Sequence, residues 1–404
     1  MTPSTQVKLL LLALFAFATT TCTADPQNNT PSHEQLAATT TELQTTLDTW
    51  REGERITGAT MSVYSTKLGQ INVASGLTKR SIDPDRFPDD PIAPNQSMFV
   101  GDLIHVLVAA CIVQLASEES VNLNATIESR FPEIENSGQI TIRNLLEHTS
   151  GIPVFYTEEF LDVLYEQSPN TSQQTVDVIA VAAEEGSFFP PSTQYGYSKT
   201  NFLVLGRIIE LVTGNPLEIE IRNRFLDPLD MNDTYLAGRE NVPGGTPSGY
   251  EYTGPFTDAP TAIDGHVPQV PEISVISAEW ASGALVSTTS DIIKLVRAIF
   301  ENEQYAEIES EMLRVAEYPA QNSGSKKINS GAGVFVWEDD DEPVIGQFGF
   351  IYPFSAQFIY WRKSGTVIAV IANEVDSSRN PNSNFQLPII ENLTNKAKNI
   401  LDAN

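Results

Sequence analysis

The pattern of apolar positions in the first third of the chain predicts two helices and a hairpin. Apolar side chains recur at helical spacing over residues 34–50, which predicts a helix. Residues 60–64 and 70–74 alternate or are rich in β-forming side chains, which predicts a hairpin. A long apolar stretch over residues 102–116 predicts a buried helix, and Asp102 at its start is a good helix cap.

The rest of the chain is first helical and then mixed. Residues 141–230 are mostly helical in pattern, and residues 238–275 are rich in Pro and Gly, which predicts irregular structure. Toward the C-terminus the pattern predicts a helix over residues 290–300, strands over 333–337, 356–361 and 367–372, and a closing helix over 388–401.

These elements predict an α/β (α+β) fold. Strands from both chain ends are expected to join one antiparallel β-sheet flanked by helices, with a largely helical lobe inserted over about residues 115–275. A chain of 404 residues is long enough for such a core. We therefore expect a single domain over residues 37–401, after a polar tether over residues 25–36.

The N-terminus resembles a secretory signal. Lys8 is followed by an apolar run over residues 9–18, which is too short to span a bilayer. Cleavage after residue 24 is one expectation, and lipidation of Cys22 is the other. Both predict a secreted, periplasmic or cell-envelope protein, with membrane contact only through a lipid anchor at Cys22. The only other cysteine is Cys111, so no disulfide is expected within the mature chain.

Charge and composition restrict the partners. The chain has 24 basic and 52 acidic residues, a net charge of −28, which disfavours nucleic acid. No cofactor is expected. The chain has four histidines, and no two of them have the close spacing of a metal-ligand motif. A metal site that joins Asp102 and His105 with Asp264 or His266 is therefore only a weak hypothesis, behind the two given below.

Six stretches, in order, carry a family resemblance. They are FVGDLIH at 99–105, ITIRNLLEHTSGIP at 140–153, FPPSTQYGYSK at 189–199, LGRIIELVTG at 205–214, ASGALVSTTSD at 281–291 and GQFG at 346–349. Together they resemble the motifs of the serine hydrolases that include class C β-lactamases, penicillin-binding proteins and D-Ala-D-Ala carboxypeptidases. The resemblance implies acyl transfer through a serine that opens a helix, assisted by a lysine three residues on and by a tyrosine. It also implies a strand that supplies an oxyanion N–H and binds a substrate carboxylate.

The sequence departs from this pattern at its reactive positions. Asp102 stands at the serine position and His105 at the lysine position, and Lys199 replaces the asparagine that follows the tyrosine. Only the tyrosine and the glycine of the third motif are retained. The positions that match the family's catalytic residues are Asp102, His105, Tyr197 and Lys199, and those that match its substrate-binding strand are Gln347, Phe348, Gly349 and Phe350.

Two hypotheses for function follow. The first is a catalytically degenerate protein with a ligand-binding or structural role, whose cleft holds a peptide or a small acyl compound. In it, Lys199 forms an ion pair with Asp102 that plugs the site. The second is an active hydrolase of esters, peptides or amides that uses water, Tyr197 and His105. For single residues the alternatives are that His105 is a core histidine and that Lys199 points to solvent.

The replaced strand motif carries its own expectation. Phe348 stands where the family has a small hydroxyl residue, so a donor to a substrate carboxylate is lost and bulk is added. Phe350 and Tyr352 follow, and we expect the wall of the cleft to be aromatic and Phe348 to obstruct it.

Overall fold

The computed structural model describes residues 31–81, 88–253, 266–316, 318–323, 326–339, 342–376 and 387–404. The expected signal segment, Cys22, most of the expected tether and Asp264 lie outside the described residues. No helix among the described residues is both long and apolar enough to cross a membrane.

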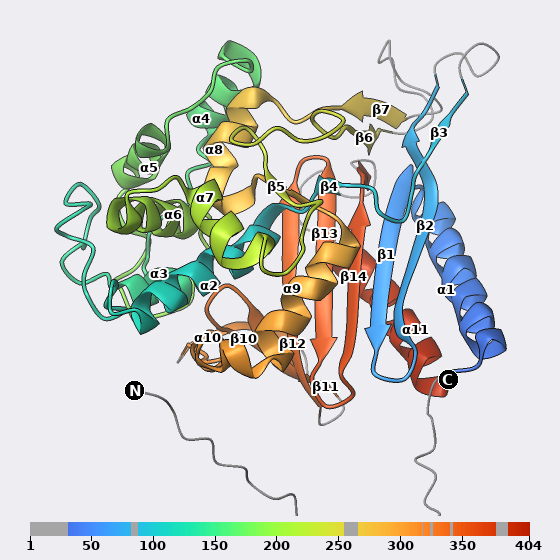
Figure 1. Ribbon diagram of the computed structural model, residues 1–404. Coiled ribbons are helices and arrows are strands. Elements are labelled where there is room, and N and C mark those ends of the chain that lie inside the picture. The colour runs from blue at the N-terminus through green and yellow to red at the C-terminus, as the bar shows by residue number, and fades with distance from the viewer. Residues whose placement is uncertain are drawn as a thin grey trace, which may run out of the picture.

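One large antiparallel sheet organises the molecule (Figure 1). Its nine strands lie in the order β3-β2-β1-β14-β13-β12-β11-β10-β9. Their bounds are β1 (Gly58–Ser65), β2 (Gly69–Lys79), β3 (Asp90–Pro91), β9 (Pro319–Ser323), β10 (Lys326–Ser330), β11 (Phe335–Asp339), β12 (Glu342–Ile351), β13 (Phe354–Trp361) and β14 (Thr366–Ala372). The central pairing joins β1 to β14, so strands from both chain ends share this sheet, as the sequence predicted.

Helices cover both faces of the sheet. On one face α1 (His33–Glu54) and α11 (Leu387–Ala403) pack on a core that includes Leu43 and Leu47. On the other face α2 (Ile104–Ser117) and α9 (Thr289–Glu301) belong to the larger core, which continues into the helical lobe. Strand alternation divides the two cores, because successive side chains of a strand point to opposite faces.

The helical lobe lies beside one end of the sheet (Figure 1). Its elements are α3 (Ile142–Leu146), α4 (Glu158–Asp162), the π-helix η2 (Val163–Gln167), α5 (Thr175–Glu184), α6 (Thr200–Thr213), α7 (Leu217–Ile221), the π-helix η3 (Arg222–Leu226) and α8 (Ile273–Gly283). Helix α6 ends at Gly214, whose φ of 75° is the left-handed conformation that glycine adopts easily. The remaining helices are the 3-10 turns η1 (Gly101–Leu103) and η4 (Glu303–Tyr305), and α10 (Ala306–Met312).

Two small sheets complete the described chain. They are β15-β6-β7 and β4-β8-β5, formed by β4 (Met98–Phe99), β5 (Tyr235–Leu236), β6 (Gly249–Tyr252), β7 (His266–Gln269), β8 (Leu285–Ser287) and β15 (Glu374–Asp376). The stretch predicted to be irregular therefore contains β6 and β7, which pair with each other because their backbone groups need partners.

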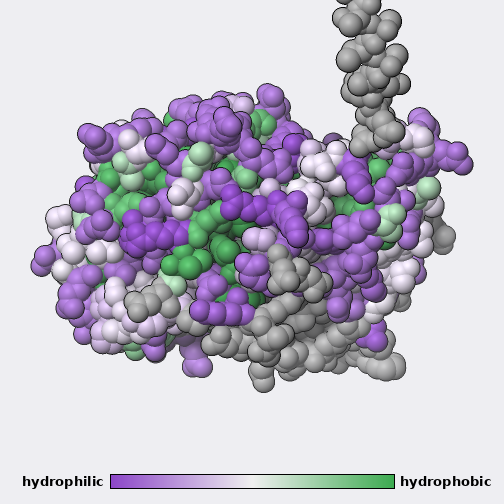
Figure 2. All heavy atoms as spheres, turned by 90° about the horizontal axis from the view of Figure 1, so that it is seen from below, coloured by the Kyte–Doolittle hydropathy of each residue, from purple (hydrophilic) through white to green (hydrophobic). Residues whose placement is uncertain are grey.

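One further detail differs from the sequence-based expectations. Helix α1 starts inside the expected tether, because the Ser32 side chain accepts the Gln35 N–H at 3.0 Å and caps it. The lower face of the molecule is mostly polar at its margin, with apolar residues gathered near the centre (Figure 2).

Candidate functional site

Asp102 lies in η1, between β4 and α2, and does not cap a helix. The N-cap positions of η1 and α2 are Val100 and Leu103, and neither helix start has a side-chain cap. The prediction that Asp102 is a helix cap is therefore wrong. Gly101, at φ 54°, lets η1 lie directly on β12, since a Cβ there would come 2.4 Å from the Phe350 nitrogen.

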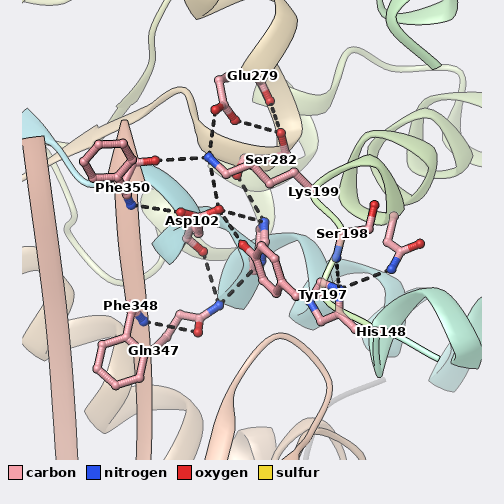
Figure 3. Close-up of polar contacts among 12 residues, drawn as sticks. Asp102, His148, Tyr197, Ser198, Lys199, Glu279, Ser282, Gln347, Phe348 and Phe350 are labelled. Carbon is pink, nitrogen blue, oxygen red and sulfur yellow. Dashed lines mark hydrogen bonds and ion pairs between the residues drawn. The ribbon is translucent and has the colours of Figure 1, made fainter. Parts of the chain in front are cut away.

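The Asp102 carboxylate instead collects three donors from distant parts of the chain (Figure 3). Oδ1 accepts the Tyr197 hydroxyl at 2.5 Å and lies 3.2 Å from Lys199 Nζ. Oδ2 accepts the Phe350 N–H of β12 at 2.8 Å. The residue is only 5% exposed. The family resemblance implies that an N–H of this strand binds the substrate oxyanion. Here the Phe350 N–H binds the carboxylate of Asp102 instead.

Lys199 stands at the start of α6 and is buried between two carboxylates. Its Nζ lies 2.7 Å from Glu279 Oε1 as well as 3.2 Å from Asp102 Oδ1, and it donates to the Phe350 carbonyl at 3.1 Å. Burial alone lowers the pKa of a lysine, but Asp102 and Glu279 outweigh it and raise the pKa of Lys199 to about 12. The ion pair expected with Asp102 is present, and the alternative that Lys199 faces solvent is wrong.

Glu279 is the residue of this cluster that the sequence analysis missed. It lies in α8 and is 1% exposed. Its carboxylate accepts the Tyr156 hydroxyl and, at 3.0 Å, the Ser282 hydroxyl. One signal was available, because Glu279 is a lone acid in the apolar and small stretch ISAEWASGA, directly before the ASGALVSTTSD motif. A buried acid of this kind needs a partner.

The two tyrosines act as neutral donors to these carboxylates. Burial, followed by the negative charge of Asp102, raises the pKa of Tyr197 well above its usual value. Burial and then Glu279 do the same to the pKa of Tyr156. Both hydroxyls therefore keep their protons and hold the carboxylates in place.

His105 is a core histidine. It is 0% exposed, its ring stacks on Phe202 with centroids 3.6 Å apart, and its Nε2 lies 3.1 Å from the Ser282 carbonyl. Burial, followed by the charge of Lys199, lowers its pKa well below 6.5. A neutral ring then donates from Nε2 to Ser282, and its Nδ1 faces the Gln347 amide at 3.5 Å.

His148 and Ser198 support the loop that carries Tyr197. The Ser198 N–H donates to His148 Nδ1 at 3.2 Å, and the Ser198 hydroxyl donates to the Pro153 carbonyl at 2.9 Å. The His148 ring lies 4.5 Å from the Tyr197 ring, and burial lowers the pKa of His148 to about 3. Ser198 is 1% exposed, so its hydroxyl is not presented to a substrate.

The four positions of the substrate-binding motif divide between the two sides of β12. Gln347 faces η1 and donates to the Asp102 carbonyl at 3.4 Å. Gly349 faces the same way, and a Cβ there would come 1.8 Å from the Val100 carbonyl oxygen. Strand alternation places the Phe348 and Phe350 rings on the other side of β12 (Figure 3). There the Phe348 ring packs near that of Phe335, with ring centroids 5.9 Å apart. Phe350 meets the Asp102 cluster through its backbone N–H and carbonyl, and the aromatic cleft wall stays a prediction.

Among the described residues, Asp102, His105 and His266 do not form a metal site, and Asp264 lies outside these residues. His266 lies in β7, where its Nδ1 is 2.5 Å from Glu374 Oε1 and 3.4 Å from the Thr57 hydroxyl. Within the described ranges no group of three or more His, Cys, Asp or Glu side chains has an arrangement that could hold a metal ion. Asp102 is instead bonded to a lysine, a tyrosine and a backbone amide.

Comparison with known proteins decides the family. The sequence profile of the beta-lactamase family matches residues 54–388. The chain belongs to the beta-lactamase family. It is 24% identical over 348 residues to Protein flp of Staphylococcus aureus (strain MRSA252), a match that covers 84% of this chain and 62% of that protein. It is 23% identical over 214 residues to the putative penicillin-binding protein PbpX of Bacillus subtilis (strain 168), covering 53% of this chain and 49% of PbpX. This chain thus spans less than two thirds of the length of these relatives.

Solved structures share the fold. The D-amino acid amidase from Ochrobactrum anthropi SV3, complexed with L-phenylalanine amide, superposes with a TM-score of 0.77 at 20% identity, covering 91% of this chain and 99% of the amidase. The octameric penicillin-binding protein homologue from Pyrococcus abyssi superposes with a TM-score of 0.66 at 22% identity, covering 82% and 73%. At such identities the likeness establishes the fold of this beta-lactamase-family chain.

Proposed function

We propose that this protein is a non-acylating member of the beta-lactamase family with a ligand-binding or structural role. One observation carries the proposal. The residue at the serine position is Asp102, and its carboxylate is bonded to Tyr197, Lys199 and the Phe350 N–H. The groups that the family uses for a reacting substrate are here bonded to one another.

Chemistry supports the same conclusion. Attack by a carboxylate on an acyl substrate would give a reactive anhydride, and the oxygens of Asp102 are already engaged as acceptors. The Lys199 ammonium has a pKa of about 12 and therefore holds its proton at neutral pH, so it is no base. Loss of a serine nucleophile typically lowers the rate on the order of a millionfold, which leaves only binding and electrostatic effects.

The test is covalent labelling. We expect no adduct when the pure protein is incubated with a fluorophosphonate or a penicillin and its intact mass is measured. An active serine hydrolase serves as the positive control. A stoichiometric adduct that peptide mapping places on a residue lining the site would overturn the proposal. We also expect Asp102→Ser with His105→Lys to remain far from full activity, because Lys199 would still lie beside the new hydroxyl.

One observation favours the alternative of an atypical hydrolase. Tyr197 is retained at the position of the family's tyrosine, and its hydroxyl donates a hydrogen bond to Asp102. The chain also shares its fold with the D-amino acid amidase described above. Turnover of a nitrophenyl ester, a chromogenic cephalosporin or D-phenylalanine amide that is lost in Tyr197→Phe would support this second function. Turnover that Tyr197→Phe leaves unchanged would contradict a catalytic role of Tyr197.

Export is part of the proposal and rests on Lys8 and the apolar run at residues 9–18. Intact mass of the protein isolated from its own cells is expected to correspond to a start at Asp25 or at Cys22. A start at Cys22 is expected to carry the added mass of acyl chains, which anchor a protein firmly when two or more are present. Recovery of an intact Met1 start in the mature pool would contradict export.

A further inference from the structure

An exposed apolar patch lies on the helical lobe. Half of the eight exposed large apolar side chains of the described residues belong to it, namely Tyr165 (39% exposed), Val176 (55%), Val270 (51%) and Ile273 (51%). Tyr165 comes from η2, Val176 from α5 and Ile273 from the start of α8, and Val270 lies in the short connection between β7 and α8. Helices α5 and α8 lie close to one another at the upper left of Figure 1. Contiguous exposed apolar groups with a polar rim typically mark an interaction site.

Hydrogen bonds hold the three segments of the patch together. The Ser274 N–H donates to the Pro169 carbonyl at 3.0 Å, and the Ser274 hydroxyl donates to the Leu164 carbonyl at 2.5 Å. The Gln173 N–H donates to the Ser277 hydroxyl at 2.7 Å. These bonds place Ile273 beside η2 and bring the start of α5 to the second turn of α8. The patch is therefore a fixed surface of the fold.

The chain segments that carry this patch have charges of one sign. Residues 151–198 contain no Lys or Arg, and neither do residues 240–293. The first of these stretches contains seven acids, namely Glu158, Glu159, Asp162, Glu166, Asp177, Glu184 and Glu185. The lysine that follows it, Lys199, is buried and neutralised by its own two carboxylates. A surface of this composition attracts a cationic partner and repels an acidic one.

A hollow at the other end of the same helical segment adds a place for a cationic group. Helix α4 continues into η2, and the first two residues of α4, Glu158 and Glu159, line a hollow. Tyr156, Glu185 and Phe188 line the same hollow. Phe188 is 68% exposed at this hollow. Carboxylates beside an exposed aromatic ring form a favourable environment for an ammonium or guanidinium group.

We propose that the η2–α5–α8 face, defined by Tyr165, Val176, Val270 and Ile273 with the acidic residues of the same segments, docks a basic, apolar peptide segment of another protein. The apolar side chains of the partner pack on the patch, and its Lys or Arg side chains face the surrounding carboxylates. A second copy of this chain does not fit, because its net charge of −28 opposes association. The proposal goes beyond the function proposed above and holds whether or not the site at Asp102 is catalytic.

The experiment measures binding of a fluorescent 12-residue peptide of alternating Lys and Leu by anisotropy. Val270→Ser with Ile273→Ser is expected to weaken binding about tenfold or more, since two apolar contacts are removed. The matched control is Leu211→Ser with Ile219→Ser, which changes two exposed apolar side chains elsewhere (47% and 43% exposed) and is expected to leave affinity unchanged. A peptide of alternating Lys and Ser is expected to bind as weakly to the native protein as the Lys–Leu peptide does to the patch variant.

Three results would overturn the proposal. One is equal affinity of the native protein and the patch variant for the Lys–Leu peptide, and another is an equal loss in the patch and control variants. The third is a dimer, measured by light scattering, that Val270→Ser with Ile273→Ser dissociates, because this would assign the face to a second copy. All four substituted side chains are exposed, so thermal unfolding is expected to show that both variants fold.

Discussion

Replacement of Lys199 by methionine is expected to lower the free energy of unfolding by ~3–5 kcal/mol, the range found when one partner of a buried ion pair is removed. Its ammonium lies 3.2 Å from Asp102 Oδ1 and 2.7 Å from Glu279 Oε1, and its side chain is 10% exposed. Methionine fills much of the volume of the lysine stem, so the loss measures charge rather than packing. Two buried carboxylates then remain without their cation. Urea unfolding at neutral pH measures the change.

Two comparisons separate this effect from a general weakening of α6. Arg207→Met removes a partly exposed ion pair with Glu210 (35% and 21% exposed) on the same helix and is expected to cost ~0–1 kcal/mol. Adding Asp102→Asn and Glu279→Gln to Lys199→Met removes the uncompensated charge and is expected to recover most of the stability. A loss below ~1 kcal/mol in Lys199→Met would mean that the cluster does not plug the site.

The sheet could be predicted largely from local pattern. The β-rich runs at residues 356–361 and 367–372 became β13 and β14, since their side chains are buried on both faces and must be apolar. Strands β9 and β10 have the sequences PAQNS and KKINS, which carry no apolar period. These two strands form because β10 pairs antiparallel with both β9 and β11. Local β-propensity does not predict such pairing.

The site was predictable in position but not in detail. Motif order brought Asp102, Tyr197 and Lys199 together correctly, because the family fold fixes where those segments meet. The direction of the Asp102 carboxylate was not predictable from local rules. A helix-cap preference is worth about 1 kcal/mol, and a lysine, a tyrosine and a backbone N–H contributed by distant residues outweigh it. Glu279 was missed because it lies 80 residues from Lys199 in sequence.

The same buried cluster makes the protein sensitive to acid through its histidines. Burial, with the charge of Lys199, keeps the folded-state pKa of His105 well below 6.5, and burial with the neighbouring His105 lowers that of His148 to about 3. The titratable groups that face the two rings are Asp102, Lys199, Tyr195 and Tyr197. Below pH ~6.5 an unfolded chain protonates both rings while the folded protein does not. Stability is therefore present above this pH and falls as the pH decreases.

We expect the free energy of unfolding to fall between pH ~6 and pH ~5 with a slope approaching ~2.7 kcal/mol per pH unit, because each neutral buried histidine contributes ~1.4 kcal/mol per unit. For His148 this dependence ends near pH 3, where the folded protein also protonates that ring. His148→Asn is a suitable variant, because residue 148 has a φ of 56° and asparagine tolerates that conformation. It is expected to reduce the slope by about half, since one of two titrating rings is removed. Urea unfolding curves at closely spaced pH values give the slope for both proteins. Equal slopes would mean that His148 is protonated in the folded protein, which would contradict its burial as a neutral acceptor of the Ser198 N–H.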